Sequence, residues 1–271
     1  DRQGYSLRKG QRPAPVCLPG HAHGCIAAFL SEKSGAEDAG RMARYKLNVF
    51  HFHLTDNGGW RIRIDKYPRL TAEGAFRTQR DWYAWWDRND RRYLPEELRA
   101  YGGYFTKEDI REIVTYAAER HITVIPEIEF PAHSDAVFIG YPELCCTGKP
   151  YTTGEFCVGN EQVYTFMEDV LTEVMELFPS KYIHIGGDEA RKVAWATCPK
   201  CQALIERERL DGIQGLQPYM IARIQDFSLR KGGLWSAGMK YCTTNCIPKP
   251  WLCRIVDRKG LSRPLIGAIM P

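Results

Sequence analysis

Two adjacent carboxylates follow directly after an apolar, alternating run of residues. The stretch YIHIGGDEA covers residues 182–190, so Asp188 and Glu189 come just after two glycines. Two carboxylates this close repel each other when both are ionised. Because neighbours in an extended chain point to opposite sides, the two acids cannot easily face each other across a bond that is to be broken. We expect one acid to donate a proton and the other to hold or polarise a substrate group, in a reaction whose substrate supplies its own nucleophile.

Three other ionisable residues stand at the ends of apolar runs. Asp56 follows LNVFHFHL, Glu129 lies within PEIEF, and His133 follows a proline and an alanine. Ordinary explanations exist: Asp56 would be a turn residue, His133 a loop histidine, and the acid pair the start of a helix, where the dipole favours negative charge. Glu129 is harder to explain, because a carboxylate at the end of a core strand needs partners. Since these groups come from separate strand ends, we favour a catalytic site.

Strand and helix patterns alternate over residues 45–226. This order predicts parallel strands joined by right-handed crossovers. Polar groups after several strand ends favour a barrel over an open sheet, because the catalytic groups of a β/α barrel come from the C-terminal ends of different strands. We therefore predict the α/β class and a (β/α)8 TIM-type barrel, incomplete in this chain because only three strands are clear. The expected strands are 47–54, 122–130 and 182–187, and the expected helices are 105–121, which Thr106 would cap, and 161–178.

Composition and charge exclude several other classes of protein. The formal net charge is +4, from 37 basic and 33 acidic residues, and the basic residues are spread out, so we expect no nucleic-acid partner. No apolar run approaches the roughly 18 residues of a membrane span. The sequence has no G-x-G-x-x-G or P-loop that would indicate a nucleotide-binding sheet. It begins without Met or a signal-like leader, which we interpret as a processed or cut end.

The chain has ten cysteines, which is high for a cytosolic enzyme. The pair Cys198 and Cys201, spaced C-P-K-C, could form half of a zinc site, but no second pair of suitable spacing follows it. We therefore favour disulfides in an oxidising compartment, joining Cys145 or Cys146 to Cys157.

Four stretches together resemble the family 20 glycoside hydrolases, the β-N-acetylhexosaminidases. They lie in order over residues 41–226, and H-x-G-G-D-E combined with P-E-I-[DE]-x-P-x-H-S is highly specific. The resemblance implies a β/α barrel that removes terminal non-reducing N-acetylglucosamine or N-acetylgalactosamine from glycans with retention of configuration. Catalysis would be substrate-assisted: the 2-acetamido oxygen of the sugar attacks C1 and forms an oxazolinium intermediate. The stretches are RYKLNVFHFHLTDNGGWRIRIDKYPRLTAEGAFR, GGYFTKEDIREIV, PEIEFPAHS and YIHIGGDE.

The resemblance also assigns roles to the five candidate residues. Glu189 would be the general acid and later the base for water, and a charged Asp188 nearby would favour its protonated form. Asp188 would hold the acetamido N–H and stabilise the developing positive charge. His133, Glu129 and Asp56 would form the polar network around the acid. The resemblance implies neither a metal ion nor a cofactor, a glycan or amino-sugar partner, and an extracytoplasmic location (periplasmic, secreted or lysosomal); it leaves the oligomeric state open.

Both ends of the chain depart from the family pattern, so we divide it into segments 1–40, 41–226 and 227–271. The first segment lacks the R-G-x-x-x-D-x-x-R-H-F context of the family, and the last lacks a strand ending in G-W-D-E. Residues 237–253, taken as codons and read two nucleotides later, permit W-D-E-I-L-H-D-K-L-H-P-E-A-M-A-M, which indicates a frameshifted segment. Two alternatives to the enzyme follow: a catalytically incompetent fragment, or a sugar-binding module that uses the three tryptophans of the connection 78–103, Trp82, Trp85 and Trp86.

Overall fold

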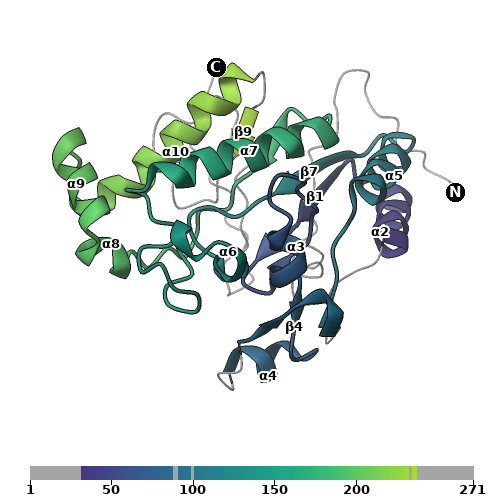
Figure 1. The fold of residues 1–271 in the computed structure, drawn as a ribbon. Helices are drawn as coiled ribbons and strands as arrows, with labels where there is room; N and C mark the ends of the chain where they lie inside the picture. Colours follow the sequence, from purple (N-terminus) through teal and green to yellow (C-terminus); the bar gives the residue numbers. More distant parts are fainter. Residues whose placement is uncertain (1–31, 88–90, 99–100, 232–233, 237–271) are drawn as a thin grey trace, which may run out of the picture.

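A parallel four-stranded sheet forms the centre of the protein, seen here in a computed structural model that describes residues 32–87, 91–98, 101–231 and 234–236 (Figure 1). The strand order is β1-β7-β8-β9, and every neighbouring pair is parallel. Val49 lies opposite Thr123, and Tyr182 lies opposite Leu234. The order of the four strands in the sheet is their order in the sequence, and all of them are parallel. This arrangement confirms the predicted β/α architecture. The strands are β1 (Val49–His53), β7 (Thr123–Glu127), β8 (Tyr182–His184) and β9 (Leu234–Ser236).

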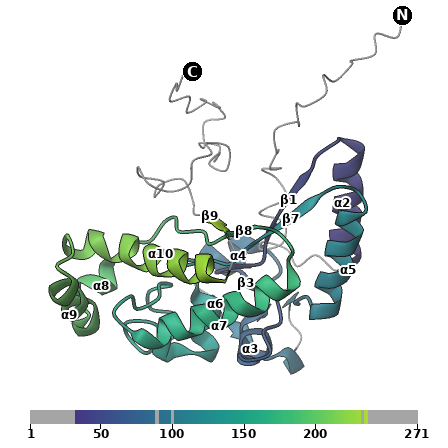
Figure 2. The same ribbon diagram turned by 90° about the horizontal axis from the view of Figure 1, so that it is seen from above.

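Helices connect these strands and cover the sheet. Figure 2 shows the four strand labels in a row, with α7 and α10 on the same side of the molecule. Two of the connecting helices, α5 and α7, are the helices that the sequence predicts, with slightly shorter bounds. The larger helices are α2 (Glu32–Arg44), α5 (Lys107–Ala118), α7 (Glu161–Leu177), α9 (Pro199–Glu208) and α10 (Gly212–Arg230), and α8 (Val193–Thr197) is a single short turn.

Local sequence explains where the two predicted helices begin. The Thr106 hydroxyl accepts from the backbone N–H of Asp109 at 3.1 Å, and the Asp109 carboxylate accepts from the N–H of Thr106 at 2.7 Å. This reciprocal pair satisfies two N–H groups that the helix itself cannot. Asn160 caps α7 with a single hydrogen bond, in which its side-chain oxygen accepts from the N–H of Gln162 at 3.2 Å. The prediction that Thr106 caps the first helix is confirmed.

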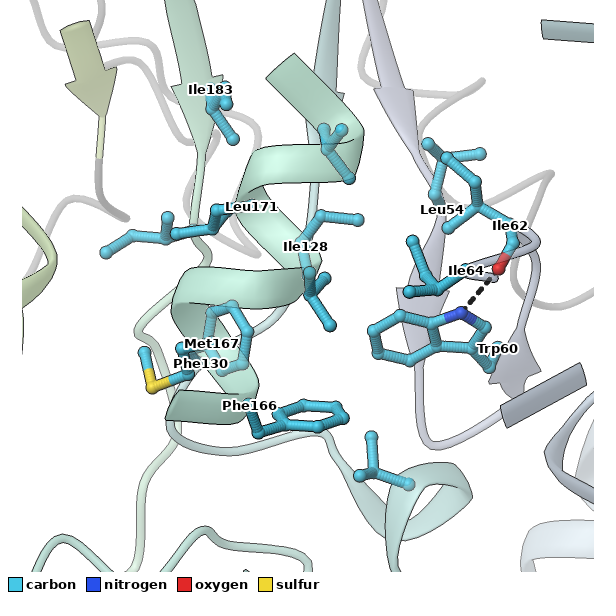
Figure 3. Packing of buried hydrophobic residues seen from close by; sticks show 14 of the residues in the cluster. Leu54, Trp60, Ile62, Ile64, Ile128, Phe130, Phe166, Met167, Leu171 and Ile183 are labelled. Carbon is cyan, nitrogen blue, oxygen red and sulfur yellow. Dashed lines mark hydrogen bonds between the residues drawn. The ribbon is translucent and has the colours of Figure 1, made fainter. Parts of the chain in front are cut away.

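The apolar core lies between the sheet and helix α7, as the close view in Figure 3 shows. Phe166, Met167 and Leu171 of α7 face Ile128 and Phe130, and all five are buried. The apolar residues of the 161–178 pattern recur at helical spacing, which predicts one inward face, and the structure buries that face. Its buried members are Val163, Phe166, Met167, Val170, Leu171 and Val174.

A long excursion separates β1 from α5. The expected polar-aromatic connection at 78–103 lies in this excursion, where a small antiparallel sheet of order β5-β4-β6 and a short helix carry its aromatic residues. The Trp60 indole N–H, at the base of the excursion, donates to the carbonyl of Ile62 at 2.6 Å (Figure 3). Its elements are β2 (Thr55–Asp56), β3 (Gly59–Trp60), α3 (Arg69–Gly74), β4 (Phe76–Arg77), α4 (Trp82–Asp87), β5 (Tyr93–Leu94), η1 (Glu96–Leu98) and β6 (Tyr101–Gly102).

Two of the elements that were not predicted from the sequence lie near the expected segment boundaries. Helix α2 crosses the expected boundary between residues 40 and 41 and packs on α5, where Gly35 allows the close approach of Ile113. Strand β9 adds a fourth parallel strand beyond α10, in the segment where we found no pattern. Residues 1–31 and 237–271, including the segment interpreted as frameshifted, lie outside the described residues. Among the helices described, none combines the length and the apolar character needed to cross a membrane.

Candidate active site

The loops after β1, β7 and β8 bring the predicted residues to one edge of the sheet. Asp56 lies three residues beyond β1, Glu129 two residues beyond β7, and Asp188 four residues beyond β8. Because parallel strands end at the same edge, the side chains from these loops converge there. The acid pair does not begin a helix, since α8 starts only at Val193.

His133 stands between two carboxylates. Its Nδ1 atom lies 3.1 Å from Oδ1 of Asp56, and its Nε2 atom lies 3.6 Å from Oε2 of Glu189. Asn57 fixes the loop beside them, because its Oδ1 accepts from the backbone N–H of Asp135 at 3.2 Å. The imidazole therefore connects a half-buried carboxylate, Asp56, with the more exposed carboxylate of Glu189.

The surroundings of His133 keep it charged. Burial alone lowers the pKa of this imidazole, but the hydrogen bond and charge of Asp56, together with the charges of Glu129 and Asp188, outweigh burial and raise its pKa to about 10. His133 is thus an imidazolium near neutral pH, and its two N–H groups point toward the two carboxylates. The imidazolium can stabilise negative charge on Glu189.

The two glycines before Glu189 adopt the backbone conformation that places it here. Gly186 has φ +62° and Gly187 has φ +97°, which are left-handed values that favour glycine. A side chain at position 186 would also collide with the carboxyl group of Glu129. The carbonyl of Gly187 accepts from the amide of Gln217, a fully buried residue of α10, at 2.7 Å. Glu189 then has φ +53° and a side chain that is 62% exposed.

A buried layer of histidines and glutamates lies beneath these groups. The Glu127 carboxylate is 2.6 Å from Nε2 of His51, 2.6 Å from Nδ1 of His184 and 3.4 Å from Nδ1 of His53. Nε2 of His53 lies 3.1 Å from Oε1 of Glu129. Four of these five residues, all except Glu129, were not predicted from the sequence. Alternation within LNVFHFHL places His51 and His53 on one face of β1, and this signal could have revealed them.

The pKa values of the two glutamates in this layer shift in opposite directions. Burial raises the pKa of Glu127, but the charges and hydrogen bonds of His53, His184 and His51 outweigh it and hold its pKa well below the ordinary value. Burial and the neighbouring charge of Glu127 raise the pKa of Glu129 well above its ordinary value, although the charge of His133 opposes this. The opposite shifts favour the ionised form of Glu127 and disfavour the ionised form of Glu129, as expected for two adjacent buried carboxyl groups.

The described residues offer two kinds of metal-ligand group. The His51, Glu127 and His184 ligand atoms and the His53, Glu127 and Glu129 ligand atoms lie close together, but they hydrogen-bond one another. Donor–acceptor distances of 2.6 Å leave no room for an ion, because ligand atoms about 2.1 Å from one metal stand roughly 3 Å or more apart. The other group consists of cysteines.

The predicted disulfides are absent, and this expectation was wrong. The five described cysteines are free thiols. The Cys145 thiol turns away from Cys157 and contacts the carbonyls of Pro142 and Lys149, at 3.2 and 3.3 Å. The thiols of Cys146 and Cys157, which we expected to form a disulfide, instead belong to a cluster of four cysteines.

A pocket of about 420 Å³ opens beside His133 and Glu189. This volume is within the usual range for small-ligand sites. Asp188, Asp56 and Glu129 are not part of its lining. Tyr93 and Tyr151 stack with ring centroids 6.2 Å apart. Trp86 also lines the pocket, whereas Trp85 is fully buried and packs on Tyr93. The wall includes Asn57, Trp86, Tyr93, His133, Tyr151 and Glu189.

An acid with a paired imidazolium, opening into an aromatic-lined pocket at the carboxyl edge of a parallel sheet, is typical of a β/α-barrel hydrolase. The model of glycosyl hydrolase family 20, catalytic domain, matches residues 28–251. The chain belongs to this family.

Curated relatives are similar to the chain over much of its length. It is 38% identical over 212 residues to a β-hexosaminidase of Porphyromonas gingivalis, covering 75% of this chain and 25% of the relative. It is 39% identical over 193 residues to a β-hexosaminidase of Vibrio furnissii, covering 67% of this chain and 30% of the relative. The match thus spans only a quarter to a third of the length of these relatives.

Solved structures share the fold. The β-N-acetylhexosaminidase of Bacteroides fragilis NCTC 9343 superposes with a TM-score of 0.69 at 32% identity, over 84% of this chain and 43% of that one. The exo-β-N-acetylglucosaminidase of Vibrio harveyi, solved with N-acetylglucosamine, gives a TM-score of 0.71 at 31% identity, over 82% of this chain and 35% of that one. The described strands therefore correspond to part of a TIM-barrel catalytic domain.

Proposed function

We propose that the protein removes terminal non-reducing N-acetyl-β-D-hexosamine residues, GlcNAc or GalNAc, from glycans by substrate-assisted retaining hydrolysis. The observation that carries the proposal is the acid pair, whose Glu189 opens into the pocket beside the imidazolium of His133. Family membership supports the reaction class. The complex of the Vibrio harveyi relative with N-acetylglucosamine supports the sugar.

In this proposal, Glu189 protonates the glycosidic oxygen and later accepts a proton from the attacking water. Its exposed carboxyl group can reach a substrate in the pocket. His133, held by Asp56, stabilises the carboxylate that Glu189 becomes. Glu129 supports this network from below, through its contact with Nε2 of His53.

Asp188 holds the acetamido group rather than attacking the sugar. As the direct neighbour of Glu189, it cannot take the opposite side of the glycosidic bond, as the second carboxylate of a two-acid mechanism must. The acetamido oxygen of the substrate then supplies the nucleophile. Asp188 accepts the acetamido N–H and stabilises the positive charge of the oxazolinium.

Hydrolysis of a chromogenic N-acetyl-β-glucosaminide tests the proposal. We expect turnover that a thiazoline analogue of the oxazolinium inhibits, with retention of anomeric configuration. Thiazoline binding without turnover would favour an incompetent fragment of such an enzyme. Binding of simple N-acetylglucosamine that depends on Trp86 and is indifferent to thiazoline would favour a sugar-binding module. Neither binding nor turnover would contradict the proposal.

We also propose an extracytoplasmic location, because the family resemblance implies one. Disulfides would have supported this location, but the five described cysteines are free thiols. Fractionation of the native cells, followed by immunoblotting for the protein, tests the location; detection only in the cytoplasm would contradict it.

A further inference from the structure

Four cysteine sulfurs gather at the junction of α9 with the loops before α7. The Sγ atom of Cys157 lies 3.6 Å from that of Cys198 and 3.9 Å from that of Cys201. Cys146 Sγ lies 3.9 Å from Cys201 Sγ. All four sulfur atoms are within 4.8 Å of one another.

These separations match the edges of a metal-centred tetrahedron. Zinc binds thiolate sulfur at about 2.3 Å, so the sulfurs of a tetrahedral site stand about 3.8 Å apart. Three of the separations, 3.6, 3.9 and 3.9 Å, lie around this value. We propose that Cys146, Cys157, Cys198 and Cys201 form a structural zinc site.

The surrounding backbone is shaped to hold the four sulfurs. Cys157, Cys198 and Cys201 are buried, and Cys146 is half-buried. Cys198 is the residue that caps α9, and Cys201 lies in its first turn, where the helix dipole favours thiolates. A side chain at Gly159 would collide with the backbone of Lys200, so the Cys157 loop lies directly on that turn. Both halves of the site are thus fixed by the fold.

The fifth described cysteine, Cys145, shows that the cluster does not simply include every nearby thiol. Cys145 is adjacent to Cys146 in sequence and is buried, yet its thiol contacts the Pro142 and Lys149 carbonyls and takes no part in the cluster. Among the described residues the cluster contains four sulfurs, which is the ligand number of a closed structural zinc site. Cys145 therefore provides a matched control.

A metal here would fix one wall of the pocket. The loop between Cys146 and Cys157 contains Tyr151 and Glu155, which line the pocket. The Glu155 carboxylate accepts the backbone N–H groups of Arg191 and Lys192, two and three residues beyond Glu189. The zinc site would join the loop, α9 and the segment after the acid pair. Its existence does not depend on the proposed function.

Metal content and thiol state test the site directly. The full chain is purified and dialysed against metal-free buffer, and its zinc is measured by plasma mass spectrometry. We expect one zinc per chain, released when a mercurial reagent modifies the thiols. The Cys145→Ser variant should keep its zinc, and Cys146→Ser and Cys201→Ser should retain less than about one-tenth of a zinc per chain.

Cobalt substitution of the unmutated chain keeps the test independent of whether a variant folds. A tetrathiolate site gives intense visible bands and a sulfur-to-cobalt charge-transfer band, and Cys145→Ser should preserve both. Disulfides between these cysteines, found by mass spectrometry after alkylation without reductant, would overturn the proposal. So would four free thiols with no bound zinc and no cobalt spectrum, or equal zinc in the Cys146→Ser and unmutated chains.

Discussion

Glu189 is positioned by the two glycines before it and electrostatically supported by the imidazolium beside it. This arrangement makes a leaving-group test possible for its proposed role. Glu189→Gln should lower kcat by about 100-fold or more on substrates with poor leaving groups, because these need the proton most. Substrates with good leaving groups should lose much less. Steady-state kinetics on a series of aryl N-acetylglucosaminides checks this, and an equal loss across the series would contradict the role of proton donor.

The role proposed for Asp188 differs from that proposed for Glu189, and a second substitution separates the two. Asp188→Asn removes the charge that steadies the oxazolinium, so the cleavage of N-acetyl sugars should fall for good and poor leaving groups alike. A thiazoline inhibitor should bind this variant at least about tenfold more weakly, whereas binding to Glu189→Gln should change less. Inhibition constants measured for the three proteins decide it; an unchanged constant in Asp188→Asn would refute the assignment.

His133 provides a prediction about pH. Its folded pKa, about 10, exceeds the ordinary value of 6.5, so the folded chain binds this proton more tightly than the unfolded chain does. The resulting stabilisation is complete below pH 6.5 and is lost as the pH rises toward 10. Asp56→Asn removes its main partner, so it should lower both the pKa of the imidazole and the stability near pH 6, with less effect near pH 10.

Proton NMR of the His133 ring and thermal unfolding at several pH values test this prediction. Asp226→Asn, on the exposed face of α10, is the control and should leave both measurements unchanged. If His133 titrates near 6.5 in the unmutated protein, the charged imidazolium inferred for the site is wrong.

At the scale of elements, residues with a strong local period could be predicted and irregular contacts could not. The face of α7 and the cap at Thr106 follow from spacing alone. Strand β9 has three residues and follows directly on two glycines, too short a run for alternation to show. The cysteine cluster was missed because its second pair, Cys146 and Cys157, is joined by a loop rather than by a short C-x-x-C turn. Only the fold brings those two together.

The cap of α5 carries a stability prediction. Thr106→Ala leaves the N–H of Asp109 without its acceptor and should lower the free energy of unfolding by about 1 kcal/mol. Thr115→Ala, on the exposed face of the same helix, should be neutral or slightly stabilising because alanine is the better helix former. Urea unfolding of the three proteins measures the difference. Equal stabilities for both variants would show that the cap contributes little.

At the scale of the molecule, the described strands account for half of a barrel. A closed barrel has eight parallel strands, and the described residues form four. Their carboxyl edge already holds the acid pair, the imidazolium and one aromatic wall of the pocket. This edge could be predicted from the sequence because each polar residue that follows an apolar strand can be recognised without knowing the others. Which neighbouring strands complete the pocket depends on long-range pairing, which no local pattern specifies.

The position of strand β9 relates the frameshift interpretation to the fold. Strand β9 ends at Ser236, and its carboxyl end lies at the same edge as Asp188 and Glu189. Read two nucleotides later, the codons from Ala237 onward permit W-D-E as the next three residues. The family motif would then follow directly on β9, at the edge where catalytic groups of a barrel belong.

We therefore predict that resequencing the gene will find a change of frame between codons 227 and 253, with codons 41–226 unchanged. A chain expressed from the repaired frame should carry W-D-E after β9 and hydrolyse a chromogenic N-acetylglucosaminide at least about tenfold faster than the present chain, because more of the pocket's walls come from family sequence. The present chain with Ser236→Ala, which leaves the frame untouched, is the control and should show no such gain. An unbroken frame through codon 253, or a repaired chain no more active than the present one, would show that the segment after β9 is the protein's own sequence.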